Sequence, residues 1–192
     1  MKGYKMNIKV WSSAISALLL VPAAQAAEFT SIQYDKSSLH FVYKQMGVPV
    51  DGSFKKFNVQ LAFDPAKLAN AKVAFDLNLA SIDAGSDEAN DEVSSKSWFN
   101  TKVYPKATFT STAVKQLAGN RYEVSGKITI KGHTQTISAP FTFSPQGNTA
   151  TVDGGFVLKR ADFAIGEGVW SDFGTVANDI QINFHFLANT SK

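Results

Sequence analysis

The stretch VSGKITIKGHTQTISAPFTF, residues 124 to 143, holds two alternating runs of apolar and polar residues joined by a short turn. The first run, extended back by two residues, places on one face Tyr122, Val124, Gly126, Ile128 and Ile130. The second places on one face Ile137, Ala139, Phe141 and Phe143. A period of two is typical of β-strands with one buried face. The stretch therefore predicts two strands joined at Lys131-Gly132-His133.

The same alternation recurs on both sides of this stretch. It is clearest near the end of the chain, in Ile180, Ile182, Phe184 and Phe186, and weaker at 39–43, 59–63, 73–79, 107–111 and 152–158. Turn-forming sequences separate the runs, at Asp64-Pro65, Gly119-Asn120 and 145–148. About eight strands with mostly short connections predict an all-β fold, either a closed antiparallel barrel or a sandwich.

One segment, 86–99, departs from the strand pattern and predicts a helix. Ser86 is suited to cap its start, the acidic cluster DEANDE falls in the first turns, and Lys96 falls near the negative end of the helix dipole. A shorter helical turn is expected at 65–68.

The first 26 residues have the build of a secretory signal peptide. They contain a basic start, an apolar stretch from Val10 to Val21, and Ala24-Gln25-Ala26, which predicts a cut after Ala26. The apolar stretch is shorter than the roughly 20 residues that span a bilayer. We therefore expect no stable membrane insertion, and a periplasmic or secreted mature protein formed by 27–192 as one domain.

The charge and cysteine content of the mature chain exclude several functional classes. Residues 1–26 hold three of the 19 Lys and Arg and none of the 16 Asp and Glu, so the mature chain has a formal net charge of zero. A nucleic-acid partner is therefore not expected. Cysteine is absent, which excludes thiol chemistry and cysteine-based metal sites.

Four stretches resemble the YceI-like family, also called bacterial lipocalins: YKQMGVPVDGSF at 43–54, SKSWFNTKVYPKATFTST at 95–112, the stretch at 124–143, and FVLKRADFAIGEG at 156–168. The resemblance implies an extended eight-stranded antiparallel lipocalin-like barrel with one short helix near its mouth. It also implies a long tunnel for a polyisoprenoid, a quinone or another amphiphile, and some secreted members capture hydrophobic drugs. His133 and Ala164 depart from the common pattern and leave the ligand open.

On this interpretation the apolar tunnel would be lined by Phe41, Tyr43, Leu61, Phe75, Leu77, Trp98, Phe109, Ile128, Phe141, Phe156, Phe163, Trp170 and Phe184. The plainer alternative for each is ordinary core packing. Candidate contacts for a polar head group are Lys159, Arg160, Asp162 and Tyr104. For Arg160 and Asp162 the alternative is a solvated ion pair on the surface.

Catalytic and metal-binding motifs are absent from the sequence. His40, His133 and His185 are isolated and are interpreted as surface residues, and the acidic run lacks the order of a calcium loop. We therefore expect no metal and no cofactor other than a bound polyisoprenoid or quinone-like lipid.

Three hypotheses follow. The first is a non-enzymatic protein that carries or sequesters a hydrophobic small molecule or lipid. The second is a lipid-modifying enzyme that uses His133, Asp162 and Arg160, and the third is a solid barrel with a stress-related interaction role. The sequence does not specify an oligomeric state.

Overall fold

The computed structural model describes residues 28–191, so the predicted signal peptide and its cut after Ala26 lie outside the described residues. The strands are β1 Phe29–Ile32, β2 Ser38–Gln45, β3 Val48–Phe54, β4 Phe57–Ala62, β5 Lys72–Asn78, β6 Ile82–Asp83, β7 Lys106–Ala118, β8 Arg121–Ile130, β9 His133–Gln146, β10 Thr149–Lys159 and β11 Asp179–Thr190. The helices are α1 Asp87–Ser94 and the 3-10 turns η1 Tyr34–Lys36, η2 Leu68–Asn70, η3 Leu79–Ser81, η4 Arg160–Phe163 and η5 Gly168–Ser171.

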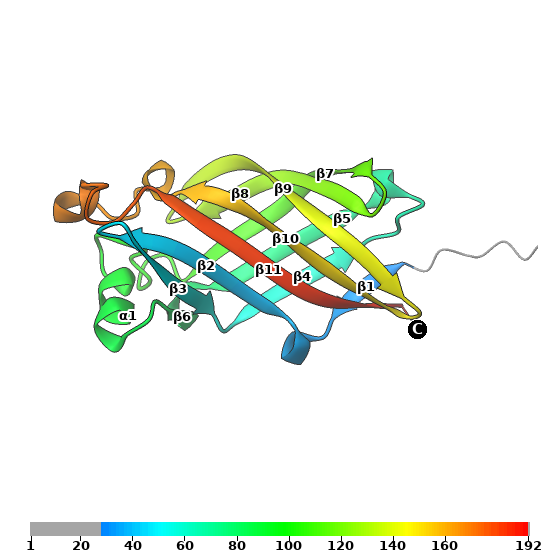
Figure 1. Ribbon diagram of the computed structural model, residues 1–192, viewed down its shortest axis with the longest axis horizontal. Helices are drawn as coiled ribbons and strands as arrows, with labels where there is room; N and C mark the ends of the chain where they lie inside the picture. The colour runs from blue at the N-terminus through cyan, green and yellow to red at the C-terminus, as the bar shows by residue number, and fades with distance from the viewer. Residues whose placement is uncertain (1–27, 192) are drawn as a thin grey trace, which may run out of the picture.

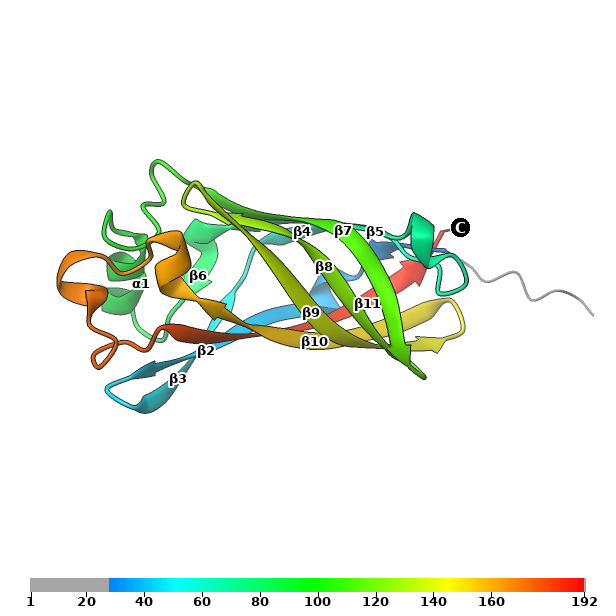
Figure 2. The same cartoon turned by 90° about the horizontal axis from the view of Figure 1, so that it is seen from above.

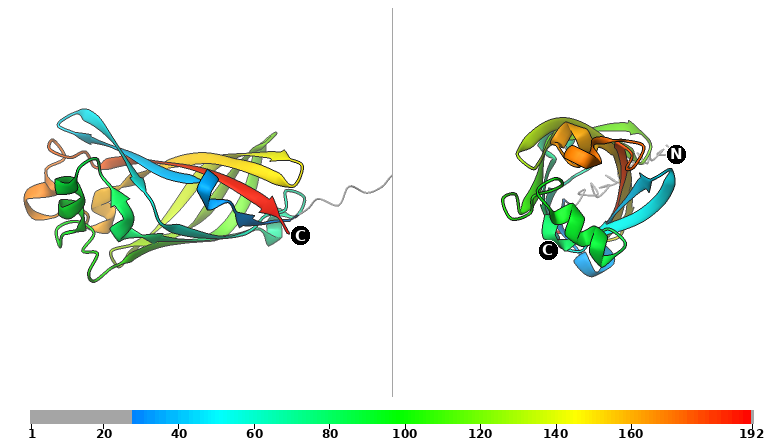
Figure 3. Two further views of the ribbon diagram at one scale, coloured as in Figure 1. Left: turned by 90° about the horizontal axis from the view of Figure 1, so that it is seen from below. Right: turned by 90° about the vertical axis from the view of Figure 1, so that its left-hand side faces the viewer.

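The strands form one antiparallel sheet that curls into an elongated barrel (Figures 1 and 3). Its order is β4-β5-β7-β8-β9-β10-β11-β2-β3-β6. β3 pairs with β2, whereas β4 pairs with β5, and only Lys55 and Lys56 separate β3 from β4. Counted as one kinked strand, β3 and β4 link the two edges of the curled sheet. The prediction of an eight-stranded antiparallel barrel is therefore confirmed.

The alternating patterns located eight of the strands and missed three short or irregular ones. β3 carries Pro49 and Gly52, which hide its alternation, and β1 and β6 are too short to show a period. β1 pairs with the end of β11, and Phe29 forms an isolated bridge with Phe63 just after β4. This small strand therefore closes the wall where β4 and β11 diverge.

The predicted helix is present but shorter than expected. Ser86 is the N-cap, with its Oγ accepting a hydrogen bond from the Ala89 N–H at 3.2 Å, as predicted. The helix ends at Ser94, so Lys96 lies beyond it and is not at its negative end. The helical turn expected at 65–68 also differs, because the chain makes a simple turn there and the 3-10 helix η2 starts at Leu68.

The two ends of the barrel differ in construction. At one end lie α1, the β2–β3 hairpin and the long connection between β10 and β11; we call this end the mouth (Figures 1 and 2). The described chain starts and finishes at the opposite end, where the Ser191 N–H donates to the carbonyl oxygen of Glu28 at 3.0 Å. Within 28–191, no helix has the length and apolar character needed to cross a bilayer.

Candidate ligand-binding cavity

A cavity of about 580 Å³ occupies the interior of the barrel. Its lining extends from Ile32 and Phe143 near one end to Val93 and Trp170 at the mouth, and it is overwhelmingly apolar. Binding pockets for small molecules span roughly 300–1,000 Å³ and are mostly apolar. The cavity therefore has the size and chemistry of a site for a hydrophobic ligand.

The inward-facing side chains of the middle strands show that the barrel is hollow. Phe75, Ile128 and Phe184 line the cavity, yet each is only partly buried. In a filled core, inward residues of a closed barrel would be fully buried by their neighbours. The alternative of a solid barrel is therefore wrong for this chain.

Three glycines let aromatic rings lie close to the barrel wall. A Cβ built on Gly126 would lie 2.5 Å from Cζ of Phe109, and one on Gly154 would lie 2.5 Å from Cζ of Phe184. A Cβ on Gly52 would likewise overlap the ring of Phe41. Each ring therefore occupies the space that a side chain would need on the adjacent strand, which leaves the centre of the barrel open.

Aromatic rings close the end opposite the mouth. Phe63 lies 4.7 Å from Phe143 and 5.5 Å from Tyr122 between ring centroids, and Phe29 lies 5.1 Å from Phe143. All four are at most 5% exposed, and Phe63 and Phe143 line the cavity. We call these four residues the aromatic plug, and it forms the floor of the cavity.

At the mouth, α1 lies over part of the opening and contributes the most polar part of the lining (Figure 3). Ala89 and Val93 pack on the core, whereas Glu88 and Glu92 border the cavity. Hydrogen bonds from its own backbone N–H and from Ser86 lower the pKa of Glu88. Burial raises the pKa of Tyr43, another lining residue, whose hydroxyl donates at 3.1 Å to the carbonyl oxygen of Ala84 in the segment that leads into α1.

Arg160 is buried at the mouth and holds the connection between β10 and β11. It is 1% exposed, and its five N–H groups donate at 2.7–3.2 Å to the carbonyl oxygens of Ile165, Gly166, Trp170, Val176 and Ala177. Desolvation lowers its pKa, and among the described residues no carboxylate forms an ion pair with it. Its role here is to fix the fold of this connection.

Two tryptophans adjoin this arginine. The guanidinium carbon of Arg160 lies 5.4 Å from the ring centroid of Trp98, and Trp98 lies 5.6 Å from Trp170. The Nε1–H of Trp98 is buried without a hydrogen-bond partner. A buried N–H left unpaired costs about 1–3 kcal/mol, which makes this donor an unusual feature of the lining.

A second anchor joins the β8–β9 turn to the same connection. The buried Nζ of Lys131 donates to the carbonyl oxygen of Ala164 at 2.6 Å and to Oε2 of Glu167 at 2.7 Å. The hydrogen bond and charge of Lys131 lower the pKa of Glu167. Arg160 and Lys131 thus both bind residues of the connection between β10 and β11.

Of the predicted tunnel residues, all but one line the cavity. Phe163 is 2% exposed but sits on η4, beyond the end of β10, where it packs in the core without reaching the cavity. Whether the lining residues contact a ligand stays a prediction.

The predicted head-group residues are not brought together. Lys159 and Asp162 are exposed, Tyr104 is 36% exposed, and none of the three lines the cavity. Arg160 does line it, but the alternative of a solvated pair with Asp162 is wrong, because Arg160 is buried and bonded to carbonyl groups. The pattern at 156–168 gave no sign of this burial, since the carbonyl partners come from a loop without periodicity.

The groups required by the enzymatic alternative do not meet inside the cavity. His133 and Asp162 are exposed outside the cavity, and every N–H of Arg160 is engaged. His40 and His185 are exposed as well, and residues 28–191 contain no group of three or more His, Asp or Glu suited to a metal ion.

Sequence reasoning missed several parts of the site. It did not identify Glu88 and Glu92 as lining residues, because the acidic run resembled an ordinary solvated helix start. It also missed the aromatic plug, although Phe63, Tyr122 and Phe143 belonged to recognised strands. Their inward phase was a usable signal, but phase alone does not give their depth along the barrel.

Comparisons with known proteins agree with this geometry. The family model described as the YceI-like domain matches residues 31–188. A UPF0312 protein of Azotobacter vinelandii is 29% identical over 178 residues, which cover 87% of this chain and 89% of that protein.

Two solved structures share the fold. The crystal structure of BcnA from Burkholderia cenocepacia is 44% identical, has a TM-score of 0.80, and covers 83% of this chain and 100% of that chain. A polyisoprenoid-binding domain from Saccharophagus degradans is 16% identical with a TM-score of 0.64, over 87% of this chain and 100% of that chain. At that identity the second likeness bears on the fold alone.

Proposed function

The chain belongs to the YceI-like family, and on that basis we propose that it binds the apolar chain of an amphiphilic lipid, such as a polyisoprenoid or a quinone, inside the barrel. In this proposal the protein carries or sequesters the lipid without modifying it. The observation that carries the proposal is the hollow, apolar cavity that extends from the mouth to the aromatic plug. The name of the Saccharophagus domain, polyisoprenoid binding, supports the ligand class.

The energetics of burial fit a chain-like ligand. Removing one methylene from water is worth about 0.8 kcal/mol, so a five-carbon isoprene unit is worth roughly 3–4 kcal/mol. A few units would hold the ligand firmly against loss to water. Transfer from a bilayer gains much less, because lipid tails are already apolar. Loading from a membrane and unloading to one are therefore both feasible for a carrier of this kind.

The polar end of the ligand would lie at the mouth. Arg160 cannot donate to it in this conformation because its five N–H groups are already bonded. The other polar groups of the lining include the Glu88 and Glu92 carboxylates, the neutral side chains of Gln45, Ser86 and Thr108 and, after a small adjustment, the unpartnered Nε1–H of Trp98. We therefore favour a neutral head group, such as a hydroxyl or quinone, over a phosphate.

The proposed site of action is the periplasm or the cell exterior. This location rests on the predicted signal peptide in residues 1–26.

Native mass spectrometry of the mature protein, followed by organic extraction, tests the binding proposal. We expect a stoichiometric lipid, and binding of an added prenyl alcohol to the extracted, refolded protein. Ile128→Trp, which places a larger side chain in the cavity, should weaken both results, whereas Val157→Trp on the outer face of β10 should weaken neither. Circular dichroism would show that both variants fold. An empty protein that also rejects added prenyl alcohols would contradict the proposal.

A further inference from the structure

Large apolar side chains are exposed mainly around the mouth. Among the described residues nine such side chains are exposed, and six of them lie at this end, on its loops, on η5 and at the first residue of β3. These six, which we call the mouth rim, are Met46, Val48, Val103, Tyr104, Val169 and Phe173. Val169 is 87% exposed and Met46 is 78% exposed, so neither contributes to the core of the barrel.

The three loops that carry the mouth rim are connected around the opening. The Met46 N–H donates to the carbonyl oxygen of Thr175 at 2.9 Å, which joins the β2–β3 hairpin to the loop that carries Val169 and Phe173. Tyr104 lies against Gly132, in the β8–β9 turn. Lys131 in turn binds Ala164 at the start of that same loop. The apolar tips are therefore held in fixed positions on several sides of the cavity entrance (Figure 3).

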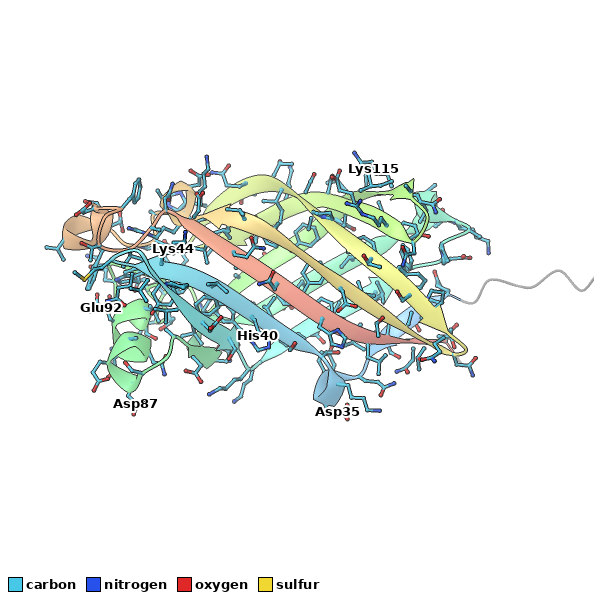
Figure 4. The ribbon with its side chains drawn as sticks, in the orientation of Figure 1. Asp35, His40, Lys44, Asp87, Glu92 and Lys115 are labelled. Atoms are coloured by element: carbon cyan, nitrogen blue, oxygen red, sulfur yellow. The ribbon has the colours of Figure 1, made fainter. Side chains whose placement is uncertain are left out.

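The charge at this end is negative. The segments 44–51, 83–106, 131–133 and 159–179 form the mouth end and contain seven Lys or Arg and ten Asp or Glu, whereas the mature chain as a whole is neutral. Asp87 and Glu92 on α1 lie at this end with Lys44, while Lys115 lies far from it (Figure 4). An anionic surface would be repelled by this end, and a neutral one would not.

We propose that the mouth rim docks on the surface of an electrically neutral bilayer, with its apolar tips inserted at the boundary of headgroups and acyl chains. Separate loop tips with Val, Met, Phe and Tyr insert readily at that depth. The entrance of the cavity would then face the lipid, and an apolar chain would pass between bilayer and barrel without crossing water. This transfer of a lipid chain rests on the function proposed above. The docking itself can be measured without a ligand in the cavity.

The arrangement favours a bilayer over another protein. A stable protein interface needs about 800 Å² of continuous complementary surface on each partner. The mouth rim instead consists of separated tips with charged residues between them, around an opening that is continuous with the apolar cavity. Both ends of the described chain lie at the other end of the barrel, so neither 28–30 nor 189–191 covers the rim.

Flotation of the mature protein with vesicles of phosphatidylcholine tests the docking. We expect part of the protein to float with the vesicles, and Met46→Asp and Val169→Asp each to lower the partition coefficient roughly tenfold, a factor that corresponds to about 1.4 kcal/mol. Asp suits the left-handed backbone at position 46, where φ is 51°, so this variant introduces no strain. The matched control is Leu117→Asp, which replaces an exposed apolar residue at the end of β7 far from the mouth and should float like the wild type; Val157→Asp, on the outer wall of β10 and not on the mouth rim, should do the same.

Two further results would separate the possibilities. Replacing a third of the lipid with phosphatidylglycerol should reduce flotation, and stronger flotation on that anionic lipid would overturn the proposal. The proposal would also be overturned if the wild-type protein did not float, or if the rim and control variants lost flotation equally. A dimer in solution that the rim variants disrupt would overturn it too, because the rim would then be a protein interface. Binding of a prenyl alcohol in detergent should survive the rim variants. If the wild-type protein did not bind the prenyl alcohol in detergent, that result would contradict the function proposed above. The flotation result would still test the docking proposal.

Discussion

At the scale of single residues, glycines in the wall determine both stability and cavity shape. A Cβ on Gly154 would lie 2.5 Å from the carbonyl oxygen of Pro140, which is backbone and cannot move aside. We expect Gly154→Ala to lower the free energy of unfolding by about 1–3 kcal/mol in urea denaturation. Gly174→Ala is the control, because its Cβ would meet only the exposed Asp172 carboxylate, at 3.2 Å. Equal stability of the two variants would show that Gly154 is not needed for close packing.

Gly52 should behave differently, because the atoms nearest to a Cβ there belong to the ring of Phe41, a side chain, and not to the backbone. In Gly52→Ala the ring can turn away from the wall, and the space available to it is the cavity. We expect the variant to fold, with a smaller loss of stability than Gly154→Ala, and to bind a fluorescent prenyl probe at least roughly tenfold more weakly. Titration of the probe measures this effect. Unchanged affinity would mean that Phe41 does not border the bound ligand.

Arg160 is the residue whose replacement should most disturb the mouth. Arg160→Met leaves five carbonyl groups without their donor, three of them in fully buried hydrogen bonds, and we expect a loss of about 3 kcal/mol or more in the free energy of unfolding. Arg160→Lys retains at most three donors, so its free energy of unfolding should lie between those of the wild type and Arg160→Met. Faster hydrogen exchange in 164–177 would locate the effect. A fully stable Met variant that had lost only ligand binding would instead indicate a head-group contact.

At the scale of elements, the link between the β8–β9 turn and the β10–β11 connection should depend on pH. The pKa of Glu167 in the folded protein lies below its ordinary value of 4.5, because Lys131 binds the carboxylate. Such a group stabilises the folded state above the ordinary pKa, and the contribution is lost as the pH falls through the lower, folded pKa.

The prediction concerns acid conditions only. Wild type should exceed Glu167→Gln in melting temperature above the ordinary pKa of 4.5, and the difference should disappear as the pH falls through the lowered, folded pKa. The effect is small because the carboxylate is largely exposed. Thermal melts of both proteins across this range provide the test. A difference that persists at low pH would mean that the amide change acts through packing and not through the ion pair.

The elements also show what alternation can and cannot reveal. Strands β8 and β11 were predicted from period-two patterns, and the Ser86 cap from one side chain, because each signal is local in the sequence. The same alternation places Phe75 and Ile128 inward but cannot tell whether another side chain or empty space lies opposite them. Arg160 escaped prediction for a related reason, since its carbonyl partners lie 5–17 residues away along an irregular loop.

At the scale of the whole molecule, a barrel that is open at one end and closed by the aromatic plug at the other limits the length of ligand chain that it can bury. Each added isoprene unit should strengthen binding until the chain reaches the aromatic plug, after which further units remain outside the barrel and add little. Affinity measured for a series of prenyl alcohols should therefore rise and then level off. A continued rise through the longest chains would mean that the chain passes the plug.

Shortening a residue of the plug should move that limit. Phe143 is 2% exposed and borders the cavity, so Phe143→Ala would extend the floor, at a cost of about 3–5 kcal/mol in stability. Phe143→Leu offers a milder change if the alanine variant does not fold. We expect affinity to level off at a longer chain in either variant, whereas Phe173→Ala at the mouth should leave the limit unchanged. If the chain length at which affinity levels off changed in Phe173→Ala but not in the Phe143 variants, the end of the chain would lie at the mouth. The ligand would then be reversed in the barrel.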